Sequence, residues 1–140
     1  SDLKQSVSAL KICLAGVTGP EQFAFYNLLS MLLEAHFRRL GQQEDIQLSI
    51  EACRAFLAES GIHDPMIQMI VFWRLSKALV AYHDATRDGE MLDKAAGVGR
   101  DAVRLCGEDH LLLAMILALQ GMILRQRFVV HENEEDLKAA

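Results

Sequence analysis

Proline and aromatic residues are scarce in this sequence, which has two prolines in 140 residues and 6% aromatic side chains. Sandwiches and barrels of β-strands need frequent turns and many aromatic and β-branched residues, so the scarcity counts against both. Apolar residues make up 51% of the chain, enough for a buried core in about one domain. The composition therefore favours stacked helices.

Positive charge is also in short supply. The chain carries a formal net charge of -5 and its isoelectric point is near 5.5. Proteins that bind nucleic acids present a net basic face to the phosphates. We therefore expect no nucleic-acid partner.

Paired cysteines and long apolar runs are missing too. Cys13, Cys53 and Cys106 lie in three separate apolar segments without a CxxC motif, which is typical of small buried side chains in a reducing compartment. We therefore expect a cytoplasmic protein.

The most apolar stretch, Leu111–Leu124, is 14 residues long and contains Gln120. This length is too short to cross a hydrocarbon core, so we expect a buried helix and no membrane partner.

The usual arrangements of catalytic and metal-binding residues are absent. The five histidines are spread along the chain without ligand spacing, and no GxSxG context presents a serine nucleophile. Gly97 and Gly99 resemble half of a phosphate-binding loop, but no strand precedes them and no third glycine follows, so close helix packing explains them better. We expect neither a cofactor nor a metal, and we expect that the protein is not an enzyme.

One unit of the sequence occurs twice. Residues 28–57 reappear 46 positions later, so that Leu29, Leu33 and Ile46 correspond to Leu75, Leu79 and Leu92. A weaker echo lies after this unit, at a spacing of 45 that relates Leu79 to Leu124. Another lies before it, at a spacing of 43. A fixed period of this length is typical of stacked repeats, because one unit alone cannot bury its apolar face.

Apolar residues at helical spacing, together with glycines and prolines, predict six helices and the start of a seventh. We expect helices over 2–15, 21–40, 44–59, 65–86, 90–106 and 110–130. The acidic run Glu132–Asp136 suits a helix N-terminus, so a further helix should begin at Leu137. We expect a single helical-repeat domain over 1–140, cut from a longer array, with units of about 1–20, 21–63, 64–108 and 109–140.

The repeated positions resemble a known family. Leu33, Phe37, Gly41, Asp45-Ile46, Ser49-Ile50 and Arg54, with Arg100-Asp101-Ala102-Val103 and the loop Gly61-Ile62-His63-Asp64-Pro65, resemble the elongated tetratricopeptide-type repeats found beside CHAT protease domains. The resemblance implies an all-α, right-handed solenoid of antiparallel helix pairs whose first helices line a concave surface. His83 stands where that pattern has Phe, and Gly97 and Gly99 interrupt it. No catalytic His and Cys pair of the protease type is identified here.

The expected concave surface supplies the candidate site. Its residues come from the polar sides of the first helices and their repeats: Asn27, Glu34, Arg38, Trp73, Lys77, Asp84 and Arg125. An exposed Trp among charges is typical of a binding hot spot. Large aromatic side chains more often fill the seam between units, so Trp73 belongs either to the groove or to a seam.

Three functions remain open at this stage. The first is a protein-interaction or scaffold module that binds a peptide or partner helix in the concave groove. The second is self-association, for example as a homodimer, through the apolar end faces of the helix stack. A stable dimer needs to bury roughly 800 Å² on each partner. The third is a carrier of a small apolar ligand, since methionines concentrate between Leu111 and Met122.

Overall fold

The computed structural model of the chain describes residues 2–16, 20–106 and 110–139, apart from the side chains of 110, 112, 131 and 133–139. Within these ranges the protein is all-α, with six helices and no strand, which confirms the all-α part of the predicted fold class. The helices are α1 (Asp2–Gly16), α2 (Pro20–Leu40), α3 (Gln43–Glu59), α4 (Pro65–Thr86), α5 (Gly89–Cys106) and α6 (His110–Ala139).

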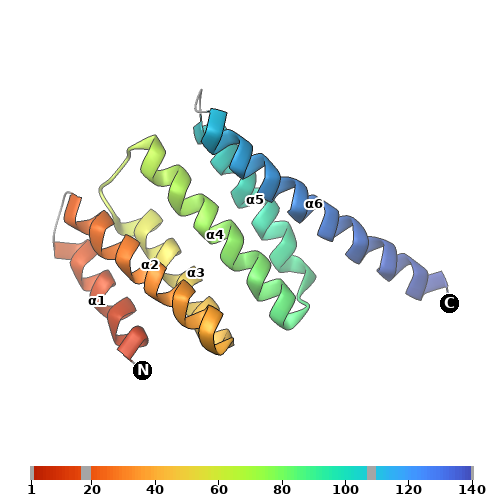
Figure 1. Cartoon of the computed structure of the whole chain (residues 1–140), viewed down its shortest axis with the longest axis horizontal. Helices are drawn as coiled ribbons and strands as arrows, with labels where there is room; N and C mark the ends of the chain where they lie inside the picture. The colour runs from red at the N-terminus through yellow and green to blue at the C-terminus, as the bar shows by residue number, and fades with distance from the viewer. Residues whose placement is uncertain (1, 17–19, 107–109, 140) are drawn as a thin grey trace.

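Each helix packs against the next one in the sequence, so the chain runs steadily from one end of the molecule to the other (Figure 1). In that view α3 and α5 lie behind α2, α4 and α6. In addition, α1 contacts α3, and α4 contacts α6. The helices from α2 to α6 therefore alternate between two layers.

The 46-residue repeat corresponds to equivalent packing positions. Leu29 and Leu75 are both buried, as are Leu33 and Leu79, and so are Ile46 and Leu92. Most of these side chains belong to one core that extends from α1 to α6. The echo at a spacing of 45 does not pair equivalent packing positions at Leu79 and Leu124. Leu79 is buried, whereas Leu124 is 47% exposed.

The helix ends follow from local backbone chemistry. Gly41 ends α2 in the left-handed region at φ 64°, and its amide donates to the Phe37 carbonyl over 2.7 Å. Asp64 caps α4: its Oδ1 accepts from the amide of Met66 at 2.9 Å, and Pro65 takes the first helical position. These features confirm the predicted helix end at Gly41 and the predicted helix start at Pro65. Asp109, which the sequence offers as the cap of the helix over 110–130, lies outside the described residues.

At Gly99 the backbone of α5 lies directly against a side chain of α6. A Cβ atom at this position would collide with the amide group of the Gln120 side chain on α6. Gln120 in turn donates from Nε2 to the Ala96 carbonyl on α5 over 3.2 Å. The prediction of close helix packing is confirmed at Gly99, whereas the nearest atom to a Cβ at Gly97 belongs to Arg100 of the same helix.

The prediction for α2 was partly wrong. The helical spacing of apolar residues in 21–40 predicts that Phe25, Leu28, Leu32 and Leu40 face the core with Leu29 and Leu33, but all four are exposed. Tyr26 is fully buried instead, and polar Gln22 is 1% exposed. A helix so rich in leucine offers two overlapping apolar stripes, and the sequence alone does not show which one the neighbours cover.

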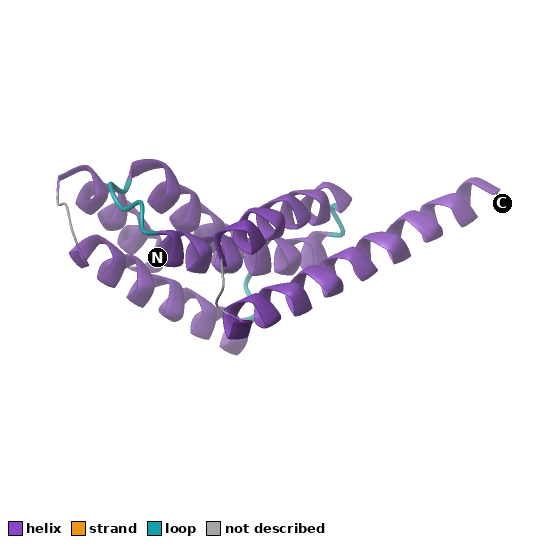
Figure 2. Cartoon of the chain, turned by 90° about the horizontal axis from the view of Figure 1, so that it is seen from above, coloured by secondary structure: helices purple, strands orange, loops and turns teal. Residues whose placement is uncertain are grey.

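Two predictions for the C-terminal segment were also wrong. One helix, α6, continues to Ala139, so no separate helix begins at Leu137. The Leu111–Leu124 stretch is not a buried helix either, because Ile116 and Ile123 are the only deeply buried residues among the described side chains of α6. The reason is visible in Figure 2, where α6 extends beyond the other helices, so that only one of its sides is covered.

The length argument against a membrane-spanning segment was wrong as well. Among the described residues, one helix is long and apolar enough to cross a membrane, over Leu113–Val130. This criterion concerns length and composition alone. Of the 18 residues in this segment, 11% are buried in the protein. The segment also includes Arg125 and Arg127.

Candidate binding groove between α2 and α4

A groove lies between α2 and α4 and is floored by α3. We call it the α2/α4 groove, and its volume is about 250 Å³. The α3 residues at its floor are Ile46, Ser49 and Cys53. The walls consist of Ser30, Glu34, Phe37 and Arg38 from α2 and of Arg74, Lys77, Ala78 and Ala81 from α4.

Beneath the groove, two polar side chains form a buried pair. The Tyr26 hydroxyl and the Cys53 sulfur lie 3.2 Å apart, and both residues are almost fully buried. Burial raises the pKa of the Cys53 thiol to about 11, and burial also raises the pKa of Tyr26 above its ordinary value. Both groups are therefore neutral at physiological pH, so Cys53 is not a thiolate nucleophile.

Arg74 joins the two walls of the groove. Its Nη2 donates to Oδ1 of Asn27 on α2 over 2.5 Å, and its guanidinium lies 5.6 Å from the centroid of the Tyr26 ring. The other terminal nitrogen, Nη1, is buried and has no hydrogen-bond partner. A buried charged donor without an acceptor is costly, so this atom favours a ligand that brings an acceptor.

The rim carries more positive than negative charge. Glu34 accepts from Arg38 Nη2 at 2.5 Å, and Lys77 Nζ lies 3.7 Å from the same carboxylate oxygen. Together with Arg74, the groove lining therefore holds three cations and one carboxylate. This excess favours a negatively charged ligand group.

The structure brings four of the seven predicted residues together. Glu34, Arg38 and Lys77 line the α2/α4 groove, and Asn27 lies beside it through its bond to Arg74. Arg74 itself was not predicted, because a shift of 46 residues pairs Asn27 with Trp73. The actual contact spans 47 residues, since side chains meet obliquely across a groove.

Trp73 takes the seam position rather than a place in the groove wall. It is half-buried and packs against a second apolar cluster formed by Met69, Ala102, Cys106 and Ile116, from α4, α5 and α6. Lys77 Nζ lies 4.9 Å from the centroid of the indole. Trp73 therefore borders the groove only through this cation–π contact.

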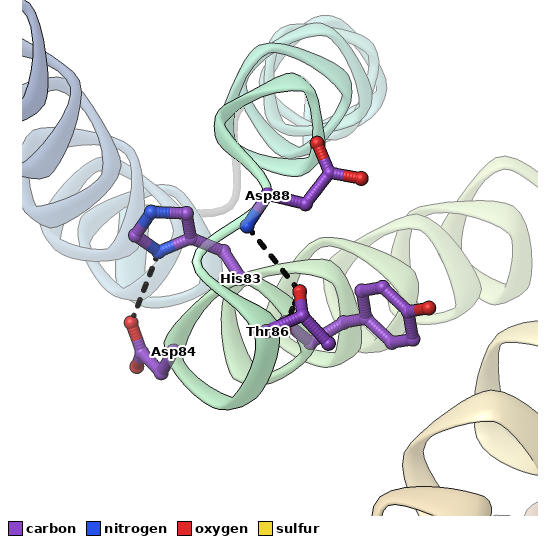
Figure 3. A network of polar contacts seen from close by, with 5 residues as sticks. His83, Asp84, Thr86 and Asp88 are labelled. Atoms are coloured by element: carbon purple, nitrogen blue, oxygen red, sulfur yellow. Dashed lines mark hydrogen bonds and ion pairs between the residues drawn. The ribbon is translucent and has the colours of Figure 1, made fainter.

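Asp84 and Arg125 lie away from the groove. Asp84 is at the end of α4, where its Oδ1 is 3.2 Å from Nδ1 of the buried His83 (Figure 3). Thr86 and Asp88 complete the turn to α5 in the same view: the Asp88 amide donates to Thr86 Oγ1 over 3.3 Å. Arg125 projects from the exposed side of α6.

A second and larger groove, of about 690 Å³, opens between α3 and α5. Leu79 and Tyr82 of α4 are among its lining residues, with apolar contributions from Ile50 and Met91. Its charged residues balance: Lys11, Arg54 and Lys94 accompany Glu51, Glu59 and Asp88. This α3/α5 groove was not predicted, and its balanced charge gives it no preference for a ligand of either sign.

The described residues hold no group of three or more His, Cys, Asp or Glu side chains placed to bind a metal ion. Their three cysteines are all unpaired thiols. The site therefore consists of hydrogen-bonding and charged groups around an apolar floor.

Comparison of the chain with family models, with curated proteins and with solved structures found no match. The resemblance to repeats beside CHAT protease domains is therefore carried by the sequence positions alone.

Proposed function

We propose that the protein is a non-enzymatic protein-interaction module that binds an acidic segment of a partner in the α2/α4 groove. The observation that carries this proposal is the unpartnered Nη1 of Arg74, buried in the lining of a groove whose two walls also hold Arg38 and Lys77. This nitrogen is covered in the free chain, so neighbouring side chains would move aside to let a carboxylate from the partner supply the missing acceptor. The apolar floor would contact the aliphatic part of the same side chain.

The dimensions of the groove narrow the mode of binding. A volume of about 250 Å³ admits one or two side chains and not a whole helix. The partner's backbone would therefore run along the rim, and a Glu or Asp side chain would enter as an anchor. As part of this proposal, the two-layered row of helices is a right-handed, tetratricopeptide-like solenoid, whose rigid walls keep the groove open.

The test uses short random peptides displayed on phage and selected on the whole chain. We expect the selected peptides to be enriched in Asp and Glu. Arg38→Glu combined with Lys77→Glu should lower the affinity of a selected peptide about tenfold or more, because two attractive contacts become repulsive. Both side chains are partly exposed, so the fold should be unaffected.

The matched control makes the same charge change in the α3/α5 groove. Lys11→Glu combined with Lys94→Glu alters net charge equally but should leave the affinity unchanged. Equal losses in both double variants would mean that only the overall charge matters. A loss confined to the control variant would move the binding site to the α3/α5 groove.

A further inference from the structure

The exposed side of α6 carries two apolar rows at the spacing of a coiled coil. The first, which we call the Leu117 row, consists of Ala114, Leu117, Gly121, Leu124 and Phe128, in steps of three and four residues. All five are exposed, including Phe128 at 67%. Such steps place residues along one line that a second helix can cover. The other row runs from Leu111 to Val129 in the same steps, and Arg125 interrupts it.

The exposed apolar area is large for a surface without a partner. Seven large apolar side chains of α6 are more than 40% exposed, from Leu111 at 73% to Met115 at 41%. With about 150–250 Å² for a large side chain, their exposed parts amount to roughly 550–900 Å². That area matches or exceeds the largest patch of a typical surface and is comparable to the roughly 800 Å² that each partner buries in a stable complex.

We propose that α6 binds the α6 helix of a second copy of this chain, antiparallel, along the Leu117 row. The row is nearly symmetric about Gly121, so an antiparallel pair sets small Ala114 against large Phe128 of the other copy and Leu117 against its Leu124. A parallel pair would instead set Phe128 against Phe128. The same surface serves both copies, so the contact closes as a two-fold dimer.

Gly121 is the crossing point in this arrangement. A Cβ atom at Gly121 would meet nothing within 4 Å in the single chain, so the α2–α5 part of the fold does not require glycine there. Glycine in a helix interior costs about 1 kcal/mol relative to alanine. A second helix backbone that approaches closely at Gly121 accounts for this otherwise unfavourable residue.

The charges on α6 favour a second copy over a membrane. Arg125 and Arg127 lie within the apolar segment, and a charged residue at the centre of a bilayer is expensive. Arg127 forms an ion pair with Asp93 of α5 at 2.8 Å, and insertion would break it. In the helix pair, by contrast, both arginines lie outside the Leu117 row and remain at its solvated margin.

Sedimentation velocity of the whole chain at tens of micromolar tests the proposal. We expect wild-type protein at twice the 15.6 kDa chain mass, and a monomer for Leu117→Glu combined with Leu124→Glu. Ile12→Glu, at an even more exposed apolar side chain on α1, should remain a dimer. Circular dichroism and thermal unfolding establish that each variant is folded.

A second variant tests the crossing point even if the double glutamate variant does not fold. Gly121→Leu adds apolar surface and helix propensity, yet it should weaken the dimer at least tenfold, because the crossing helix needs that space. Stronger association of this variant would overturn the proposal.

Three further results would also overturn it. A wild-type monomer at these concentrations would do so. If that monomer also floated with phosphatidylcholine vesicles, the exposed face of α6 would be assigned to a membrane. Loss of the dimer in Leu28→Glu, on the exposed side of α2, would indicate a head-to-tail contact between α6 and α2. Dimers that persist in the folded double glutamate variant would place the interface elsewhere.

Discussion

Tyr26 and Cys53 show how one buried polar pair supports the groove above it. Each side chain alone would leave a polar atom in the core, and their mutual contact satisfies both. The Tyr26 ring also stacks on Phe56, with centroids 4.7 Å apart, and supports the Arg74 guanidinium from below. Arg74 is thus held in place before any partner arrives.

The buried thiol predicts a loss of stability at alkaline pH. Its pKa is about 11 in the folded chain against 9.0 for an ordinary thiol, so between these values the unfolded chain loses a proton that the folded chain retains. The free energy of unfolding should therefore fall as pH rises through this window, by on the order of 1 kcal/mol per pH unit. Urea denaturation across the window measures the slope.

Cys53→Ala should flatten that slope, although part of it should remain from Tyr26, whose pKa is also raised. Cys13→Ala, at a partly exposed thiol on α1, serves as the matched control and should leave the slope intact. If Cys53→Ala had the same pH dependence as the wild type, the thiol would not be the titrating group.

Trp73 gives a prediction that separates the seam from the groove. Because the indole packs between α4, α5 and α6, Trp73→Ala should lower the free energy of unfolding by about 2 kcal/mol, less than for a fully buried Trp. Binding of a selected acidic peptide should stay within about twofold. Met66→Ala, at an exposed position of the same helix, should cost much less stability. Loss of peptide binding at unchanged stability would instead make Trp73 part of the binding surface.

At the scale of the helices, two helices end at a residue with left-handed backbone angles, and the two residues give opposite predictions. Gly41 and Arg87 occupy equivalent places after α2 and α4, at φ 64° and 60°. Gly41→Ala should destabilise the chain by about 1 kcal/mol, and Arg87→Gly should stabilise it by up to about 1 kcal/mol, because a Cβ atom is strained in this region.

Gly61→Ala is the control for this pair, because Gly61 lies in open space and outside the left-handed region. Its substitution should change the free energy of unfolding by less than either helix-end variant. Thermal denaturation of the three variants gives the order. Equal effects at Gly41 and Gly61 would contradict the role assigned to the backbone angle.

The helices themselves were largely predictable from the sequence. The first five begin and end within one residue of the predicted bounds, because glycine, proline and an Asp cap interrupt the helical pattern where the chain turns. The sixth was not predictable in the same way. No glycine or proline follows Gly121, so nothing ends α6 before the acidic run. Acidic residues begin helices readily, but they are also tolerated inside them.

At the scale of the whole molecule, the repeat correctly paired core positions but not groove positions. Leu29 and Leu75 are equivalent because both face the core that the helices share. A groove residue depends on how far neighbouring units are rotated and shifted, which a spacing of 46 does not specify. Glu34, Arg38 and Lys77 could be predicted because they lie on the polar sides of their helices. Arg74 could be recognised only from the three-dimensional structure.

The charge around the groove predicts how binding depends on salt. An acidic peptide held by Arg38, Arg74 and Lys77 should bind several-fold more weakly when salt rises from about 0.05 M to about 0.5 M, because screening weakens the partly exposed contacts. Isothermal titration at the two salt concentrations measures the change. Arg38→Gln should show a shallower dependence than the wild type. An affinity independent of salt would contradict an electrostatic anchor.

The central claim is that the α2/α4 groove receives an acidic partner segment. The most direct measurement is an NMR titration of the isotopically labelled chain with a selected acidic peptide. We predict that the largest amide shift changes fall on Ser30–Arg38 of α2 and Arg74–Ala81 of α4, with the Arg74 side-chain resonance among them. Changes concentrated on α3 and α5 around Glu51 and Lys94, or on the exposed side of α6, would contradict the account.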